Sequence, residues 1–127
     1  MNEPSGTARS GAWFLAVGAA AALLHLAVFG ALLGRMAPEW ANVLAFCCAF
    51  VVSFMGHRSL SFSHTQTSRK QSLWRFLITA LAGFALNELL LIAGMRWLGL
   101  PPVPALIVAQ IAAAGQTFWL ARLWAFR

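Results

Sequence analysis

The chain has 127 residues and a formal net charge of +6 at pH 7, and 61% of its residues are hydrophobic whereas only 9% are charged. A water-soluble domain usually carries about 25% charged residues, because its surface must face water. The composition therefore excludes an ordinary soluble domain. It predicts an all-α integral membrane protein, because helices satisfy their own backbone hydrogen bonds inside lipid.

Four apolar runs follow one another along the chain, at about 12–34, 38–56, 74–95 and 104–121. Each comes close to the roughly 20 residues that a helix needs to cross ~30 Å of hydrocarbon. The first run could instead be a signal peptide, but it continues beyond the ~7–15 residues of a signal-peptide core and three further runs follow. The sequence thus predicts a single domain of four transmembrane helices, with a short tail over 1–11 and a loop over 57–73.

The positive charges are distributed unevenly between the two sides of such a membrane domain. Only Arg35 and Arg96 fall on one side, and the other Lys and Arg residues fall on the opposite side. The positive-inside rule therefore places both termini and the 57–73 loop in the cytoplasm. Because topology explains the net charge, no nucleic-acid partner is expected. The residues on the cytoplasmic side are Arg9, Arg58, Arg69, Lys70, Arg75, Arg122 and Arg127.

The second run contains two adjacent cysteines, Cys47 and Cys48. Neighbouring residues of a helix point about 100° apart. These two thiols are therefore poorly placed for a mutual disulfide, and two ligands alone do not make a metal site. The expected role is packing.

A ten-residue pattern occurs twice. The stretches SFMGHRSLSF at 53–62 and TFWLARLWAF at 117–126 both read Ser/Thr-Phe-x-x-x-Arg-x-x-x-Phe. Their arginines, Arg58 and Arg122, would lie at one membrane face, where two guanidinium groups can grip one phosphate. An arginine flanked by aromatic residues at a helix end is also an ordinary interface anchor. The sequence does not favour either of these two interpretations over the other.

The similarity between the two halves extends beyond this pattern. Each half would be a helical hairpin, and the hairpins would be parallel repeats related by an axis along the membrane normal. In this alignment His25 in the first half stands opposite Asn87 in the second. The matching segments are 41–45 with 105–109, at an offset of 64 residues, and 13–15 with 75–77, at an offset of 62 residues.

Several short elements give the chain a resemblance to a known family. The segments 14–18 (FLAVG), 54–62 and 118–126, with the pair Leu86-Asn87, occur in the order found in the GtrA-like family. These are small four-helix bacterial membrane proteins associated with polyprenyl-phosphate-linked sugars. The resemblance implies a multi-pass protein of the bacterial inner membrane that helps to flip a polyprenyl-phosphate-linked monosaccharide to the outer leaflet. The sugar would then serve polysaccharide or cell-wall synthesis, with a polyprenyl-phosphate glycosyltransferase as a candidate partner.

Four polar side chains interrupt the apolar runs and are candidates for the path of the sugar head group. They are Glu88, Asn87, His25 and Gln110. Polar groups inside a membrane are costly, so they are often functional. A polar seam between the halves would hydrogen-bond sugar hydroxyls while the lipid tail stays in hydrocarbon. The alternative is that these groups cross-link helices.

A small-residue face is the candidate contact for a homodimer. Gly30-x-x-x-Gly34 in the first run matches the pattern that lets two membrane helices approach closely. The contact could serve the protomer itself or a second copy of the chain.

Some chemistries are absent from the sequence. It holds no phosphate-binding Gly-x-x-x-x-Gly-Lys-Ser/Thr loop, no metal-ligand spacing and no aspartate, so an enzyme, a cofactor and a bound metal are not expected. Transport would be downhill or would use a proton on Glu88. Two alternatives stay open: a non-transporting subunit that anchors a lipid-linked-sugar glycosyltransferase, and a small multidrug-type exporter.

Overall fold

The computed structural model describes residues 4–61 and 69–120. Within these ranges the chain is helical apart from its turns, which agrees with the predicted all-α class. The elements are α1 (Pro4–Leu32), α2 (Pro38–Gly56), the short π-helical segment η1 (His57–Ser61), α3 (Arg69–Arg96) and α4 (Pro102–Leu120).

The helices differ from the expected runs mainly at their polar ends. α1 already begins at Pro4, so most of the expected tail is helical, and α3 already begins at Arg69. A proline in the first turn is well tolerated, because its missing N–H would have no partner there. The length of an apolar run thus predicts the part of a helix that lipid can cover. The helix itself can extend into the polar residues on either side of that run.

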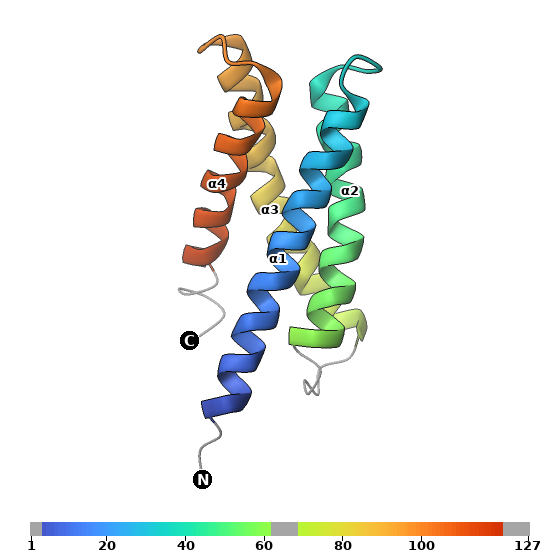
Figure 1. Ribbon diagram of the computed structural model, residues 1–127, viewed down its shortest axis with the longest axis vertical. Coiled ribbons are helices and arrows are strands. Elements are labelled where there is room, and N and C mark those ends of the chain that lie inside the picture. Colours follow the sequence, from blue (N-terminus) through green and yellow to red (C-terminus); the bar gives the residue numbers. More distant parts are fainter. Residues whose placement is uncertain (1–3, 62–68, 121–127) are drawn as a thin grey trace.

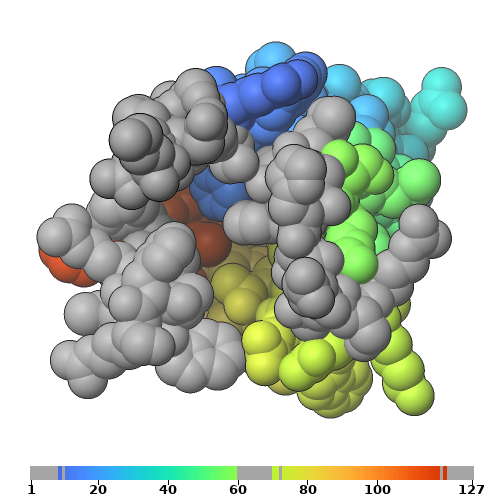
Figure 2. Space-filling model, turned by 90° about the horizontal axis from the view of Figure 1, so that it is seen from below, coloured from blue at the N-terminus to red at the C-terminus, as the bar shows by residue number. Residues whose placement is uncertain are grey.

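The four helices form two hairpins that run the same way. α1 pairs with α2 and α3 pairs with α4, and both hairpin turns lie at the upper end in Figure 1. We call this end the hairpin end, and we call the opposite end, where α1 begins, the terminal end. Seen from the terminal end, the helices follow the order α1, α2, α3, α4 around the bundle (Figure 2). Two seams therefore separate the hairpins, one between α2 and α3 and one between α1 and α4.

A glycine with positive φ shapes each hairpin turn. Gly34 has a φ of 82° and Gly99 a φ of 67°, a backbone conformation that residues with a Cβ rarely adopt. Because α1 ends at Leu32, Gly34 belongs to the turn and not to a helix face. The prediction that Gly30 and Gly34 form one small-residue helix face is therefore wrong, since the backbone turns between them.

The most deeply buried residues occur in pairs that the sequence repeat relates. The two members of each pair have almost the same exposure, although their side chains differ in size and polarity. This agreement in burial supports two hairpins built on one plan. The pairs are Phe29 with Leu91, Ala41 with Ala105, Ala45 with Ala109, and Asn42 with Leu106.

The surface of the bundle is suited to lipid. Among the described residues, three helical segments are long and apolar enough to cross a membrane: Gly11–Leu32, Pro38–Ser59 and Leu73–Arg96. The protein is therefore a multi-pass membrane protein, and a crossing by α4 stays a prediction. Cys47 and Cys48 are both exposed on this apolar surface, so the prediction that they serve packing within the bundle is wrong. Their side of α2 faces away from the other helices.

Candidate functional site

Four polar side chains from three helices meet inside the bundle. Asn42 of α2 lies at the centre, fully buried. Its side chain lies 2.6 Å from Nε2 of His25 on α1, 2.7 Å from Oδ1 of Asn87 and 2.6 Å from Oε2 of Glu88, both on α3. We call these four residues the polar cluster. The cluster connects the first hairpin to the second.

The hydrogen bonds fix the orientation of the central amide. Nδ2 of Asn42 carries two hydrogens and donates to the oxygens of Asn87 and Glu88. Oδ1 of Asn42 can only accept, so Nε2 of His25 carries the proton that it donates. The reversed amide would place oxygen against two oxygens. A single side chain thereby satisfies three polar groups within a hydrocarbon environment.

Neighbouring small residues allow Asn42 to reach this position. Ala41 and Ala45 are fully buried beside it and let α2 approach its neighbours closely. Asn42 stands between His25 and Asn87, which the repeat makes equivalent, and both are almost fully buried. The cluster therefore forms where the two halves face each other. Within the described parts of the chain, no three His, Cys, Asp or Glu side chains group as metal ligands.

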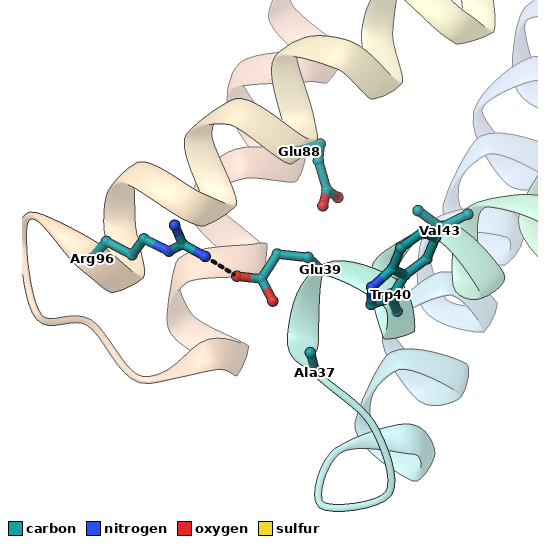
Figure 3. A pocket seen from close by; sticks show the side chains of 6 residues that line it. All are labelled: Ala37, Glu39, Trp40, Val43, Glu88 and Arg96. Atoms are coloured by element: carbon teal, nitrogen blue, oxygen red, sulfur yellow. Dashed lines mark hydrogen bonds and ion pairs between the residues drawn. The ribbon is translucent and has the colours of Figure 1, made fainter.

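A cleft opens beside the cluster toward the hairpin end, between α2 and α3. Its volume is about 420 Å³, within the range of roughly 300–1,000 Å³ that is usual for small-molecule sites. Figure 3 shows that the Glu88 carboxylate points into the space between the two helices. The lining residues are Ala37, Glu39, Trp40 and Val43 of α2, with Glu88 and Arg96 of α3. We call this space the hairpin-end cleft.

An ion pair crosses the rim of the cleft. Nη2 of Arg96 lies 3.2 Å from Oε1 of Glu39, and the Arg96 side chain is 68% exposed (Figure 3). An ion pair with so much access to water contributes little to stability, typically less than about 1 kcal/mol. It therefore links the hairpins loosely and leaves charged groups available at the mouth of the cleft.

Toward the terminal end from the cluster, phenylalanine rings line the same seam. Phe46, Phe50 and Phe54 follow one face of α2. The ring centroid of Phe46 lies 4.4 Å from that of Phe84, and the centroid of Phe50 lies 5.3 Å from that of Phe76, both on α3. The α2–α3 seam is thus polar and open toward the hairpin end and aromatic toward the terminal end.

Gln110 and Arg58 lie apart from the cluster. Gln110 of α4 donates from Nε2 to the carbonyl oxygen of Ala22, 3.5 Å away on the α1–α4 seam. Arg58 is half-buried in η1, beside His57, whose ring centroid lies 4.7 Å from that of Phe14 with the ring planes tilted by 31°. Arg122 lies outside the described residues, so its pairing with Arg58 stays a prediction.

The sequence interpretation missed Asn42 and the charged rim of the cleft. Asn42 is the only strongly polar residue between Glu39 and Ser53, which was the available signal. In the sequence, Glu39 and Arg96 are charged residues at the ends of predicted transmembrane helices, which is a common position for them. Their proximity depends on how the hairpins face each other.

A comparison with protein families agrees with this architecture. The family described as GtrA/DPMS, transmembrane domain, matches residues 13–126, a range that contains the polar cluster and the whole cleft. The chain belongs to this family. Membership confirms the GtrA-like resemblance and ties the GtrA/DPMS chain to the handling of polyprenyl-phosphate sugars. Neither curated proteins nor solved structures gave a match to this GtrA/DPMS chain.

The site of this GtrA/DPMS protein can offer hydrogen bonds to a polar ligand. Of the cluster, only the half-buried Glu88 lines the cleft, where its carboxylate can accept hydrogen bonds from a polar ligand. A buried polar ligand group without a partner would cost roughly 2–7 kcal/mol. The arrangement can therefore lower the free energy of a polar head group inside the membrane.

Proposed function

We propose that this protein moves a polyprenyl-phosphate-linked monosaccharide across the bacterial inner membrane, for use in polysaccharide or cell-wall synthesis. The observation that carries the proposal is the hydrogen-bonded polar cluster, which bridges the hairpins and adjoins an open cleft through Glu88. A sugar head group brings several hydroxyls into hydrocarbon, and such groups need partners there. The chain is expected to act as a carrier and not as an enzyme.

The position of Glu88 favours this proposal over simple helix cross-linking. Groups that only hold helices together are best placed where nothing else reaches them. Asn42 and Asn87 fit that description, but Glu88 is half-buried and lines the cleft. One of its oxygens accepts from Asn42, and its carboxylate also faces the space where a ligand would lie.

In this proposal all four helices cross the membrane. α4 has 19 residues and runs along α3, so it is about 28 Å long and matches the hydrocarbon thickness of ~30 Å. The terminal end would lie in the cytoplasm and the hairpin end outside, which the distribution of Lys and Arg supports. The cleft would then open to the outer leaflet.

Before the lipid is flipped, its phosphate would be held at the cytoplasmic end by Arg58 and Arg122. Arg58 lies in a π-helical segment, and π-helical turns are rare and are often found at functional sites. A guanidinium group matches phosphate oxygens well, because its planar fork donates two parallel hydrogen bonds. The repeated sequence pattern supports a shared role for the two arginines.

Flipping in proteoliposomes tests the proposal. A labelled short-chain polyprenyl-phosphate sugar is placed in one leaflet, and the rate at which it becomes accessible from the other side is measured. We expect a rate above that of protein-free liposomes. We also expect this rate to fall in Glu88→Gln and in the Arg58→Ala/Arg122→Ala double variant, but not in Arg75→Ala. Arg75 is a suitable control because it is an exposed arginine of α3 near the terminal end of the bundle.

Two other outcomes would replace the proposal. A flat trace for the unmodified protein with intact lipid binding would favour an anchoring subunit, and purification with a polyprenyl-phosphate glycosyltransferase would then be expected. Resistance of cells to lipophilic cations that depends on Glu88 would favour a multidrug-type exporter.

A further inference from the structure

The repeat gives the bundle two related seams, and within the described residues a cleft with a charged lining lies on one of them. The cleft on the α2–α3 seam has Glu39, Glu88 and Arg96 in its lining. At the repeat-equivalent helical positions on the α1–α4 side, the side chains are apolar. Those equivalents are Val103 for Glu39, Pro104 for Trp40, Ile107 for Val43 and Leu26 for Glu88.

This difference has a consequence for the ligand path. A repeat that served stability alone would have no reason to keep charges in one seam and remove them from the other. The concentration of two carboxylates and a guanidinium group in one open cleft provides several polar contacts for a ligand. The α2–α3 seam is therefore the side on which a polar ligand is bound.

The lining also limits the chemistry of that ligand. Arg96 is paired with Glu39, and Glu88 adds a second carboxyl group. The cleft thus has no excess positive charge with which to attract a phosphate. Carboxylates and a guanidinium group provide several acceptors and donors for hydroxyl groups. The charge balance suits a neutral, hydroxyl-rich group.

One wall of the cleft is aromatic. Trp40 and Val43 line the α2 side, and the Trp40 side chain is 68% exposed (Figure 3). The face of an indole ring carries partial negative charge and attracts weakly positive C–H groups. A sugar ring presents C–H bonds on its faces and hydroxyls around its edge. An aromatic wall beside polar groups is complementary to both.

We propose that the hairpin-end cleft binds the monosaccharide head group of the lipid-linked substrate, with the Trp40 ring against the face of the sugar and Glu39, Arg96 and Glu88 bonded to its hydroxyls. The identity of the ligand rests on the proposed function. The cleft adds a site that the polar cluster alone does not provide, next to the outer surface, where the sugar would be received or released.

Binding to the protein in lipid nanodiscs tests this site separately from transport. The probes are citronellyl phosphate and its glucose, mannose, galactose and N-acetylglucosamine derivatives, titrated calorimetrically. We expect at least one sugar derivative to bind more tightly than citronellyl phosphate itself. Trp40→Ala should weaken that derivative about tenfold and leave the sugar-free phosphate unchanged. Glu39→Gln should act in the same direction, and Trp40→Phe should retain most of the affinity.

Trp97→Ala is the matched control. Trp97 is an exposed tryptophan at the same end, next to Arg96 in sequence but outside the lining of the cleft. Its loss should leave all affinities unchanged. Because Trp40 and Trp97 are both mainly exposed, neither substitution should prevent folding, and thermal unfolding of each variant verifies this.

Three results would overturn the site: no sugar derivative binding better than citronellyl phosphate, equal loss of both kinds of probe in Trp40→Ala, or no loss at all. Tight binding of tetraphenylphosphonium that excludes the sugar probes would identify a cation site instead. Flipping is measured on the same preparations. If the protein transports the lipid but Trp40→Ala does not affect sugar binding, the cleft is not the sugar site and the proposed function stands. If sugar binding depends on Trp40 but no transport is seen, the cleft is the sugar site and the proposed function is wrong.

Discussion

Asn42 and Leu106 occupy equivalent positions in the two hairpins and both are fully buried, yet one is an amide and the other a hydrocarbon. The amide holds the polar cluster together, whereas Leu106 packs in the apolar core beside Leu91 and Ala105. A duplicated fold has thus become asymmetric at its centre. The two seams differ as well, because the α2–α3 seam has a cleft with charged residues whereas Gln110 supplies an uncharged polar contact on the α1–α4 seam.

Replacing Asn42 by Leu should make the two halves chemically alike and weaken the protein. The substitution removes the hydrogen bonds to Glu88, Asn87 and His25 and leaves their polar atoms buried. A double-mutant cycle with Asn42→Leu and Glu88→Leu should give a coupling free energy of about 0.6–2 kcal/mol in reversible unfolding in detergent. Strict additivity of the two variants would show that this contact contributes nothing to stability.

Gly56→Ala should destabilise the first hairpin. A Cβ at Gly56 would lie 2.7 Å from Cγ1 of Val17 on α1, closer than real contacts allow. Forcing the helices apart should cost about 1–3 kcal/mol in the free energy of unfolding. Gly30→Ala is the matched control, because nothing lies within 4 Å of its added Cβ and alanine favours a helix over glycine. A Gly56→Ala protein as stable as Gly30→Ala would contradict the close approach.

Breaking the Glu39–Arg96 ion pair should change stability little. The Arg96 side chain is mostly exposed, so Arg96→Gln should alter the free energy of unfolding by less than about 1 kcal/mol. The effect should shrink further at 1 M salt, where the Debye length is about 3 Å. The measurement is the unfolding midpoint in detergent at low and high salt. A large, salt-independent loss would mean that the pair is a structural lock instead of a loose link at the rim.

The stacked rings of Phe46 and Phe84 should couple the hairpins near the polar cluster. Their centroids lie 4.4 Å apart with an angle of 30° between the ring planes. Such pairs contribute roughly 0.5–1.5 kcal/mol beyond the burial of their area. A cycle with Phe46→Leu and Phe84→Leu should therefore show coupling in that range. Phe46→Leu paired with Leu81→Ala, an exposed site on the same helix as Phe84, should be additive.

The proposed topology predicts opposite labelling of the two ends. In a variant with Cys47 and Cys48 replaced by Ser, Trp97→Cys at the hairpin end should react with a membrane-impermeant maleimide in intact spheroplasts. Lys70→Cys near the start of α3 should react only after lysis. Both positions are exposed, so burial does not explain a difference. The reverse pattern would place the cleft on the cytoplasmic side.

The sequence by itself determined that this protein is embedded in lipid and that it consists of two similar helical hairpins. A chain with 61% hydrophobic residues must use lipid to cover its helices, and a repeated pattern must build two similar hairpins. It also identified Glu88, Asn87 and His25, because a polar residue in an apolar run is visible without any structure. These are local properties, and they can be read from composition and spacing.

Only the tertiary structure decided which of these groups meet. Asn42 was one polar residue in an apolar run until the packing of α1, α2 and α3 made it the common partner of three side chains. Gln110 has a similar expected depth but lies on the other seam. The difference depends on the rotation of each helix about its axis and on which hairpin faces which. Those are set by the packing of whole helices, and no single segment encodes them.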